Sequence, residues 1–173
     1  MEFKKEYFAD ERQDAFHEIG VTRQRADALG HVSGRTQFYN DRNLAGMLHM
    51  KMARSPHHHA RIRSINTAEA ERVPGVVRII RAEDVPENVS TILRLLDVGP
   101  LDEPVLAFDK VRYVGEPIVA VLGTSISAAA QGAAKVEVDY ETLPAVTDCW
   151  EATLEGAPEV WPDAPRNLAF EWE

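Results

Sequence analysis

Three consecutive histidines, His57, His58 and His59, are the side chains of this sequence best suited to bind a metal ion, because imidazole is the commonest metal ligand in proteins. Alternate residues of an extended chain point to opposite sides, so only His57 and His59 can share a face. No nearby cysteine or acidic pattern completes a zinc ligand set. We therefore favour a polar loop or an interface over a metal site.

Four further side chains have the chemistry of nucleophiles or of acids and bases. Cys149 is the only thiol, but no histidine–aspartate set is evident around it, and a structural or semi-buried cysteine is the favoured interpretation. Asp139 and Glu141 share one face of an amphipathic segment, which is typical of a solvated surface. Glu116 follows Gly115 and precedes Pro117, so a backbone corner is favoured over a catalytic acid.

Sequence signatures of common catalytic sites are missing. The sequence contains no GxGxxG, GxxxxGK[ST], GxSxG or HExxH motif, which are the patterns of nucleotide binding, serine hydrolysis and zinc hydrolysis. The residues alone therefore predict no active site.

Short strands are predicted to carry these residues. Alternation predicts strands over 46–53, about 60–65 and 136–141, with Val136 and Val138 facing the core. Strand-like sequence over 76–81 and an apolar run over 118–122, which includes Ile118 and Val119, predict two more. Residues 110–123 are strand-like on both sides of a corner at 115–117.

Helices are predicted to be few and short. Thr67 is a candidate N-cap for a helix over 68–72, and Ser125 for one that continues to about 135. Ile126, Ala129, Ala130 and Ala133 would form the flat face of the second helix. Single helical turns are expected at 82–85 and 150–154. Residues 23–42 are interpreted as a loop with one short strand near 36–39.

This pattern of elements predicts an α+β fold with a mixed or largely antiparallel sheet of short strands and two or three short helices.

Composition narrows the class of protein. A net charge of −9 over 173 residues argues against binding to nucleic acid or to an anionic membrane surface. The single cysteine fits a reducing compartment. Neither a membrane span nor a secretory signal is evident, so we expect a soluble, cytoplasmic protein.

Five segments closely resemble, in order, motifs of the large subunit of molybdenum hydroxylases, the xanthine dehydrogenase and aldehyde oxidase family. They are DALGHVSGR at 27–35, GMLHMKMARSPHHHARI at 46–62, PGVV at 74–77 with AEDVP at 82–86, VRYVGEPIVAV at 111–121 and VEVDYETLPAV at 136–146. The sequence departs from the family pattern at His58, where alanine is usual, and over 86–104.

The resemblance implies an α/β-hammerhead domain. In the intact enzymes a molybdopterin-bound molybdenum centre hydroxylates a carbon, and electrons leave through [2Fe-2S] clusters and often FAD. The resemblance implies that the catalytic glutamate and the cofactor contacts lie downstream of the hammerhead. It therefore assigns no catalytic, cofactor-binding or metal-binding residue to this chain.

A division into three parts follows from the resemblance. We expect an N-terminal extension or docking arm at 1–22, the hammerhead at 23–167, and a tail at 168–173 that leads towards the molybdopterin-binding region. The candidate contacts with the rest of the enzyme are Arg54, His57, His59, Arg61, Gly115, Glu116, Trp161 and Trp172.

Three interpretations of the function remain open. The chain is the hammerhead component of a split oxidoreductase, structural rather than catalytic by itself, with a molybdopterin-binding chain, an iron–sulfur subunit and in some cases an FAD subunit as partners. Alternatively, it is a fragment of a single-chain molybdenum hydroxylase large subunit. A third possibility is a non-enzymatic binding or scaffold protein that reuses the fold.

Overall fold

A computed structural model describes residues 25–89 and 103–168 of the chain. The chain divides into two compact units, Met1–Leu44 and Ala45–Glu173. The expected arm at 1–22, the middle of the 86–104 connection and the candidate residue Trp172 lie outside the described residues. The proposed domain boundaries stay a prediction.

The described part of the first unit is helical where the sequence analysis predicted a loop and a strand. It forms helix α1, Ala28–Val32, and a 3-10 turn η3, Tyr39–Asp41. The carboxylate of Asp41 accepts a hydrogen bond from the backbone N of Phe38 at 2.9 Å, which closes the turn. The predicted strand near 36–39 was therefore wrong, because local side-chain hydrogen bonds favour a turn there.

One three-stranded antiparallel sheet of the second unit has β5, Pro117–Gly123, at its centre. Strand β1, His49–Arg54, and strand β3, Val76–Ile80, pair with its two edges. The apolar run predicted a buried strand correctly, since residues 118–121 are all buried.

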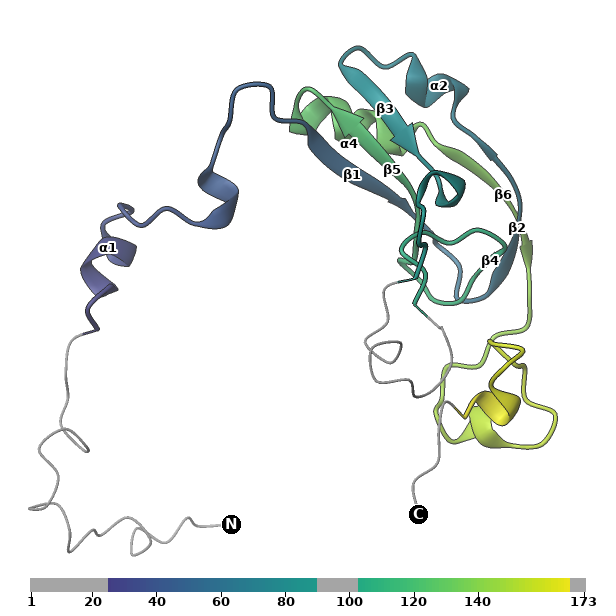
Figure 1. Ribbon diagram of the computed structural model, residues 1–173. Helices are drawn as coiled ribbons and strands as arrows, with labels where there is room; N and C mark the ends of the chain where they lie inside the picture. Colours follow the sequence, from purple (N-terminus) through teal and green to yellow (C-terminus); the bar gives the residue numbers. More distant parts are fainter. Residues whose placement is uncertain (1–24, 90–102, 169–173) are drawn as a thin grey trace, which may run out of the picture. The chain divides into compact units, whose positions relative to one another are not determined.

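The other three-stranded sheet has the order β4-β2-β6 and is also antiparallel. Its strands are β2, Ala60–Asn66, β4, Lys110–Val111, and β6, Glu137–Thr142. Figure 1 shows these strands beside the first sheet. Val136, Val138 and Tyr140 pack against the buried core, as the alternating pattern predicted.

Helix α4, Ile126–Ala134, contacts β1 and β5 of the first sheet, and it lies against that sheet in Figure 1. Ser125 caps it as predicted, since its side chain accepts a hydrogen bond from the backbone N of Ala128 at 3.1 Å. The predicted face was partly wrong: Ile126 is 71% exposed.

The buried residues of α4 are Ala128, Ala129 and Gly132. A Cβ added at Gly132 would lie 2.8 Å from methyl groups of both Val121 and Val76. The helix therefore packs on the sheet through small residues.

The shorter helices are α2, Ala68–Glu71, and the 3-10 turns η4, Ala82–Asp84, η5, Glu151–Thr153, and η6, Pro165–Asn167. Thr67 precedes α2 but does not cap it, contrary to prediction. Its hydroxyl donates to the carboxylate of Glu71 at 2.8 Å. The side chain of Asn66 instead accepts the hydrogen bond from the backbone N of Ala68, at 3.1 Å.

The core of the second unit lies where β2, β4 and β5 meet. Its fully buried members are Ala60, Ala107, Val111, Ile118, Val119 and Val121. Short antiparallel strands with few helices confirm the predicted fold class. Among residues 25–89 and 103–168, no helix has the length and apolar character needed to cross a membrane.

Candidate interface site

The corner between β4 and β5 is fixed by backbone geometry. Gly115 has φ +91°, a left-handed conformation that only glycine adopts without strain. Its N donates to the carbonyl oxygen of Ser55 at 2.8 Å, and the N of Ser55 donates to the carbonyl oxygen of Glu116 at 2.9 Å. The register of β1 against β5 shifts opposite this point, between Ala53 and Arg54. The predicted bulge or corner is confirmed.

Glu116 is a buried carboxylate within this corner, with 1% of its surface exposed. It accepts a short hydrogen bond from the backbone N of Arg112, and its other oxygen lies 4.0 Å from the guanidinium of Arg112. Burial raises the pKa of Glu116, and the backbone N–H and the charge of Arg112 oppose that rise. These contacts make Glu116 part of the internal framework of the corner.

The planar guanidinium group of Arg112 contacts residues from several segments of the chain. Its guanidinium donates to the carbonyl oxygen of Lys110 at 2.9 Å and to the carboxylate of Asp109 at 3.0 Å. The ring of Trp161 stacks over it, with 3.6 Å between the guanidinium carbon and the ring centroid. Its buried Nε has no hydrogen-bond partner among the described residues. The C-terminal segment is thus held against β4 by a cation–π contact.

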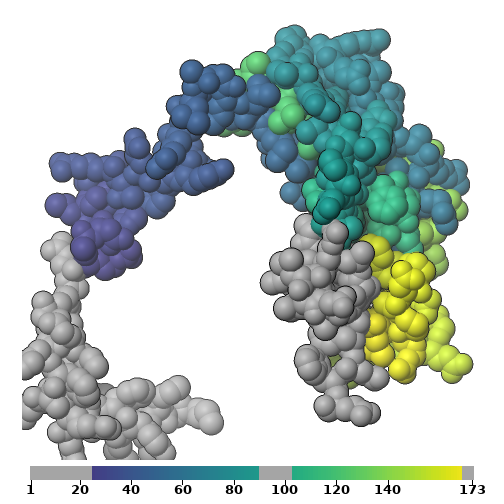
Figure 2. All heavy atoms as spheres, viewed as in Figure 1, coloured from purple at the N-terminus to yellow at the C-terminus, as the bar shows by residue number. Residues whose placement is uncertain are grey.

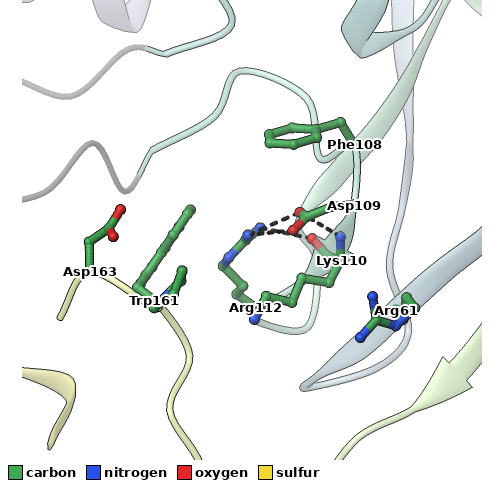
Figure 3. A pocket seen from close by; sticks show the side chains of 8 residues that line it. Arg61, Phe108, Asp109, Lys110, Arg112, Trp161 and Asp163 are labelled. Atoms are coloured by element: carbon green, nitrogen blue, oxygen red, sulfur yellow. Dashed lines mark hydrogen bonds and ion pairs between the residues drawn. The ribbon is translucent and has the colours of Figure 1, made fainter. Parts of the chain in front are cut away.

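A hollow of about 410 Å³ adjoins this stack (Figure 3). Arg61, Phe108, Asp109, Lys110, Trp161 and Asp163 line it together with Arg112. Figure 3 shows Trp161 beside Arg112 and Arg61 across the hollow from them. Two predicted interface residues, Arg61 and Trp161, are therefore brought to one site. Its lining carries both cations and carboxylates.

The histidines are engaged in contacts within the domain. The ring of His57 packs edge-on against Tyr140, with 4.7 Å between centroids. His59 is buried, and its Nδ1 donates to the carbonyl oxygen of Pro144 at 2.7 Å. His58 is exposed. Over residues 25–89 and 103–168, no three histidine, cysteine or acidic side chains are grouped to hold a metal ion.

The remaining candidates lie at separate places. Asp139 is exposed, and the carboxylate of Glu141 forms ion pairs with Arg61 at 3.8 Å and with Arg63 at 3.6 Å. Cys149 is exposed, so the expectation of a semi-buried thiol was wrong. Arg54 is exposed and donates to the carbonyl oxygen of Gly115 at 2.7 Å.

Arg112 is the central residue that the sequence analysis did not single out. The spacing of Arg112 and Glu116, four residues apart, was visible in the sequence. That spacing marks a pair only on a helix, and this segment is a strand followed by a turn. The contact with Trp161 joins residues 49 positions apart and has no local signal.

Known proteins resemble most of this chain. Residues 33–144 match the family described as aldehyde oxidase and xanthine dehydrogenase, a/b hammerhead domain. The gamma subunit of the 6-hydroxypseudooxynicotine dehydrogenase complex of Paenarthrobacter nicotinovorans is 40% identical over 138 residues, 76% of this chain and 17% of that subunit. The carbon monoxide dehydrogenase large chain of Afipia carboxidovorans is 35% identical over 176 residues, 94% of this chain and 21% of the relative.

Solved structures agree with the sequence matches. The aldehyde oxidoreductase from Desulfovibrio gigas superposes with a TM-score of 0.75 at 34% identity, and the match covers 82% of this chain and 16% of that one. The chain therefore spans about a fifth of the length of such relatives, or less. The matched residues include the corner and both sheets. The chain belongs to the aldehyde oxidase and xanthine dehydrogenase a/b hammerhead domain family.

Proposed function

We propose that this chain is the hammerhead component of a molybdopterin-dependent oxidoreductase, and that it acts by contacting the rest of the enzyme rather than by catalysis. The observation that carries the proposal is the hammerhead match to dehydrogenase and oxidoreductase subunits of which the chain spans only 17% and 21%. Names such as subunit gamma and large chain belong to multi-subunit enzymes.

The side chains with catalytic potential support a structural role. Glu116 is bound to Arg112, His59 is bound to Pro144, and His57 packs on Tyr140. A general acid or base must reach the atom whose proton it transfers, and Glu116 and His59 are buried within the domain. We therefore place the hydroxylation chemistry outside residues 25–89 and 103–168.

The residues of this chain do not fit the iron–sulfur clusters that the family implies. A [2Fe-2S] cluster is held by four cysteines, or by two cysteines and two histidines, and this sequence has one cysteine. The hollow beside Arg112 is lined by both cations and carboxylates, and Arg112 is already bound to Asp109 and to Trp161. We therefore assign molybdopterin, the iron–sulfur clusters and FAD to a molybdopterin-binding chain or downstream domain, an iron–sulfur subunit and an FAD subunit.

The interface with these partners is proposed to include Arg54, Arg61 and Trp161. Arg54 and Arg61 are exposed, and Trp161 is partly exposed beside the hollow. Tryptophan and arginine are enriched among residues that dominate interfaces. A cytoplasmic location remains part of the proposal and rests on the single cysteine.

Co-purification from the native source tests the proposal. A tag on this chain is expected to recover a molybdenum-containing enzyme, identified by mass spectrometry and by metal analysis. A molybdenum-containing polypeptide that itself includes this sequence would favour the single-chain alternative. Recovery of the chain without any molybdenum-containing polypeptide would refute both and would favour a scaffold protein.

A further inference from the structure

Tyr113 and Val114 form an apolar tip at the turn between β4 and β5, and they are 54% and 51% exposed. We propose that this apolar tip is a preorganised docking element that inserts into the molybdopterin-binding part of the enzyme. The recess that receives it would be apolar, with a hydrogen-bond acceptor for the hydroxyl group of Tyr113. This inference rests on the proposed function and specifies the surface that carries it out.

The backbone around the apolar tip is held by contacts from both sides. The N of Glu116 donates to the carbonyl oxygen of Tyr113 at 3.3 Å, and the N of Gly115 donates to Ser55 at 2.8 Å. The guanidinium of Arg54 donates a hydrogen bond to the carbonyl oxygen of Gly115 at 2.7 Å. A rigid element loses little conformational entropy on binding, so these contacts favour association through the tip.

A buried charged group contributes to the same rigidity. Glu116 is buried and binds the backbone N of Arg112, which is the residue directly before the tip. Burying a carboxylate is costly unless it is paired. The contact with Glu116 therefore fixes the backbone of the residue that leads into the tip.

The hydroxyl group of Tyr113 defines the chemistry of the recess. Partial burial, and then the nearby charge of Glu116, raise the pKa of Tyr113 above its usual value. A tyrosine hydroxyl is protonated at neutral pH with or without this shift, and it can donate one hydrogen bond. A carbonyl or carboxylate oxygen in the recess would satisfy it, because a buried hydroxyl without a partner is destabilising.

The rest of the enzyme is the occupant that the comparisons favour. The matched residues 33–144 include the apolar tip, and the chain accounts for 16% of the aldehyde oxidoreductase structure and 21% of the carbon monoxide dehydrogenase large chain. About four-fifths of such an enzyme therefore lies outside this chain. A typical interface buries about 800 Å² per partner, so two side chains would serve as its anchor, surrounded by less critical contacts.

Val77 provides a matched control. It is 55% exposed on the edge strand β3, in the other sheet from β4. A single exposed valine on a strand is ordinary surface. Replacement of Val77 by serine is therefore expected to leave association unchanged.

Footprinting of the intact molybdenum-containing enzyme with hydroxyl radicals tests the inference directly. The exposure of Tyr113 in this structure predicts about half the reactivity of a tyrosine in a short peptide. Docking of the tip predicts at least a tenfold loss of that reactivity. Reactivity near half of the peptide value in the intact enzyme would overturn the inference, whether the enzyme is one chain or several.

A double variant provides a second readout. Tyr113→Ser with Val114→Ser is expected to weaken association with the molybdenum-containing partner at least tenfold, while Val77→Ser leaves it unchanged and all three proteins keep their melting temperatures. Equal affinity of the double variant and the wild type would overturn the docking role alone. Failure of the wild type to associate with any molybdenum-containing protein would overturn the proposed function and this inference together.

Discussion

At the scale of single residues, Glu116 is unusual because it is a fully buried acidic side chain. Such side chains are almost never found without a partner. Its carboxylate has both a backbone N–H and a guanidinium from Arg112. The local chain is arranged around this pair, since Gly115 supplies the left-handed turn that brings the carboxylate back to Arg112. The residue therefore stabilises the corner and, through it, the apolar tip.

The pH dependence of stability is the first prediction at this scale. Burial raises the pKa of Glu116 in the folded chain, so between the unfolded and folded pKa values the folded state binds more protons. The contribution of Glu116 to the free energy of unfolding is then highest below its unfolded pKa and falls as pH rises through the folded pKa. Glu116→Gln removes this titration.

Unfolding experiments from about pH 4 upwards on both proteins check this prediction. The difference in the free energy of unfolding is expected to shift in favour of Glu116→Gln as pH rises. A difference that is independent of pH, or that shifts in favour of the wild type, would contradict the raised pKa. Replacement of the exposed Glu155 by Gln serves as the control, because Glu155 lies outside the corner.

At the scale of elements, the close contact between α4 and the sheet depends on glycine at 132. Glycine is less favourable than alanine in a helix by about 1 kcal/mol, so Gly132→Ala would stabilise an exposed helix. Here the added Cβ would approach Val121 and Val76 at 2.8 Å. Overpacking of this kind typically costs about 1–3 kcal/mol, and we therefore expect Gly132→Ala to lower the free energy of unfolding.

Chemical denaturation of the second unit measures this effect, with Gln131→Ala as the control on the exposed side of the same helix. The control is expected to change stability by less than about 0.5 kcal/mol. If Gly132→Ala stabilised the protein instead, α4 would not lie as close to β5 as described.

The strands could be predicted from the sequence because their patterns are local. The run at 118–121 indicates a buried strand by itself, and the alternation around Val138 places that residue towards the core. The orientation of α4 could not be predicted in full. Alanine occupies most positions of α4, so the hydrophobic periodicity does not favour one face of the helix over another. The glycine at 132 decides which face contacts the sheet.

The site was predictable in part. The corner at 115–117 followed from glycine and proline chemistry, whereas the interface role of Trp161, inferred from its residue type, stays a prediction. The link between Trp161 and Arg112 depends on how the C-terminal segment folds back, which no local pattern encodes. The same limit applies to the first unit, where the side chain of Asp41 decides between a strand and a turn.

At the scale of the whole molecule, the buried side chains of Glu116 and His59 are bonded within the domain, which fits the proposed contacting role. The second unit has a compact core, a corner fixed by a buried ion pair, and exposed groups at its edge. The match to much longer oxidoreductase subunits supports the proposal that the chain contacts the rest of an enzyme. We therefore expect activity only when the rest of the proposed enzyme is present.

Molybdenum content and turnover, measured on the same preparations, test this claim most directly. The pure 173-residue polypeptide is expected to contain no molybdenum and to show no oxidation of aldehydes or purines. The enzyme recovered with it from the native source is expected to contain molybdenum. Turnover or molybdopterin binding by the pure polypeptide would contradict the account.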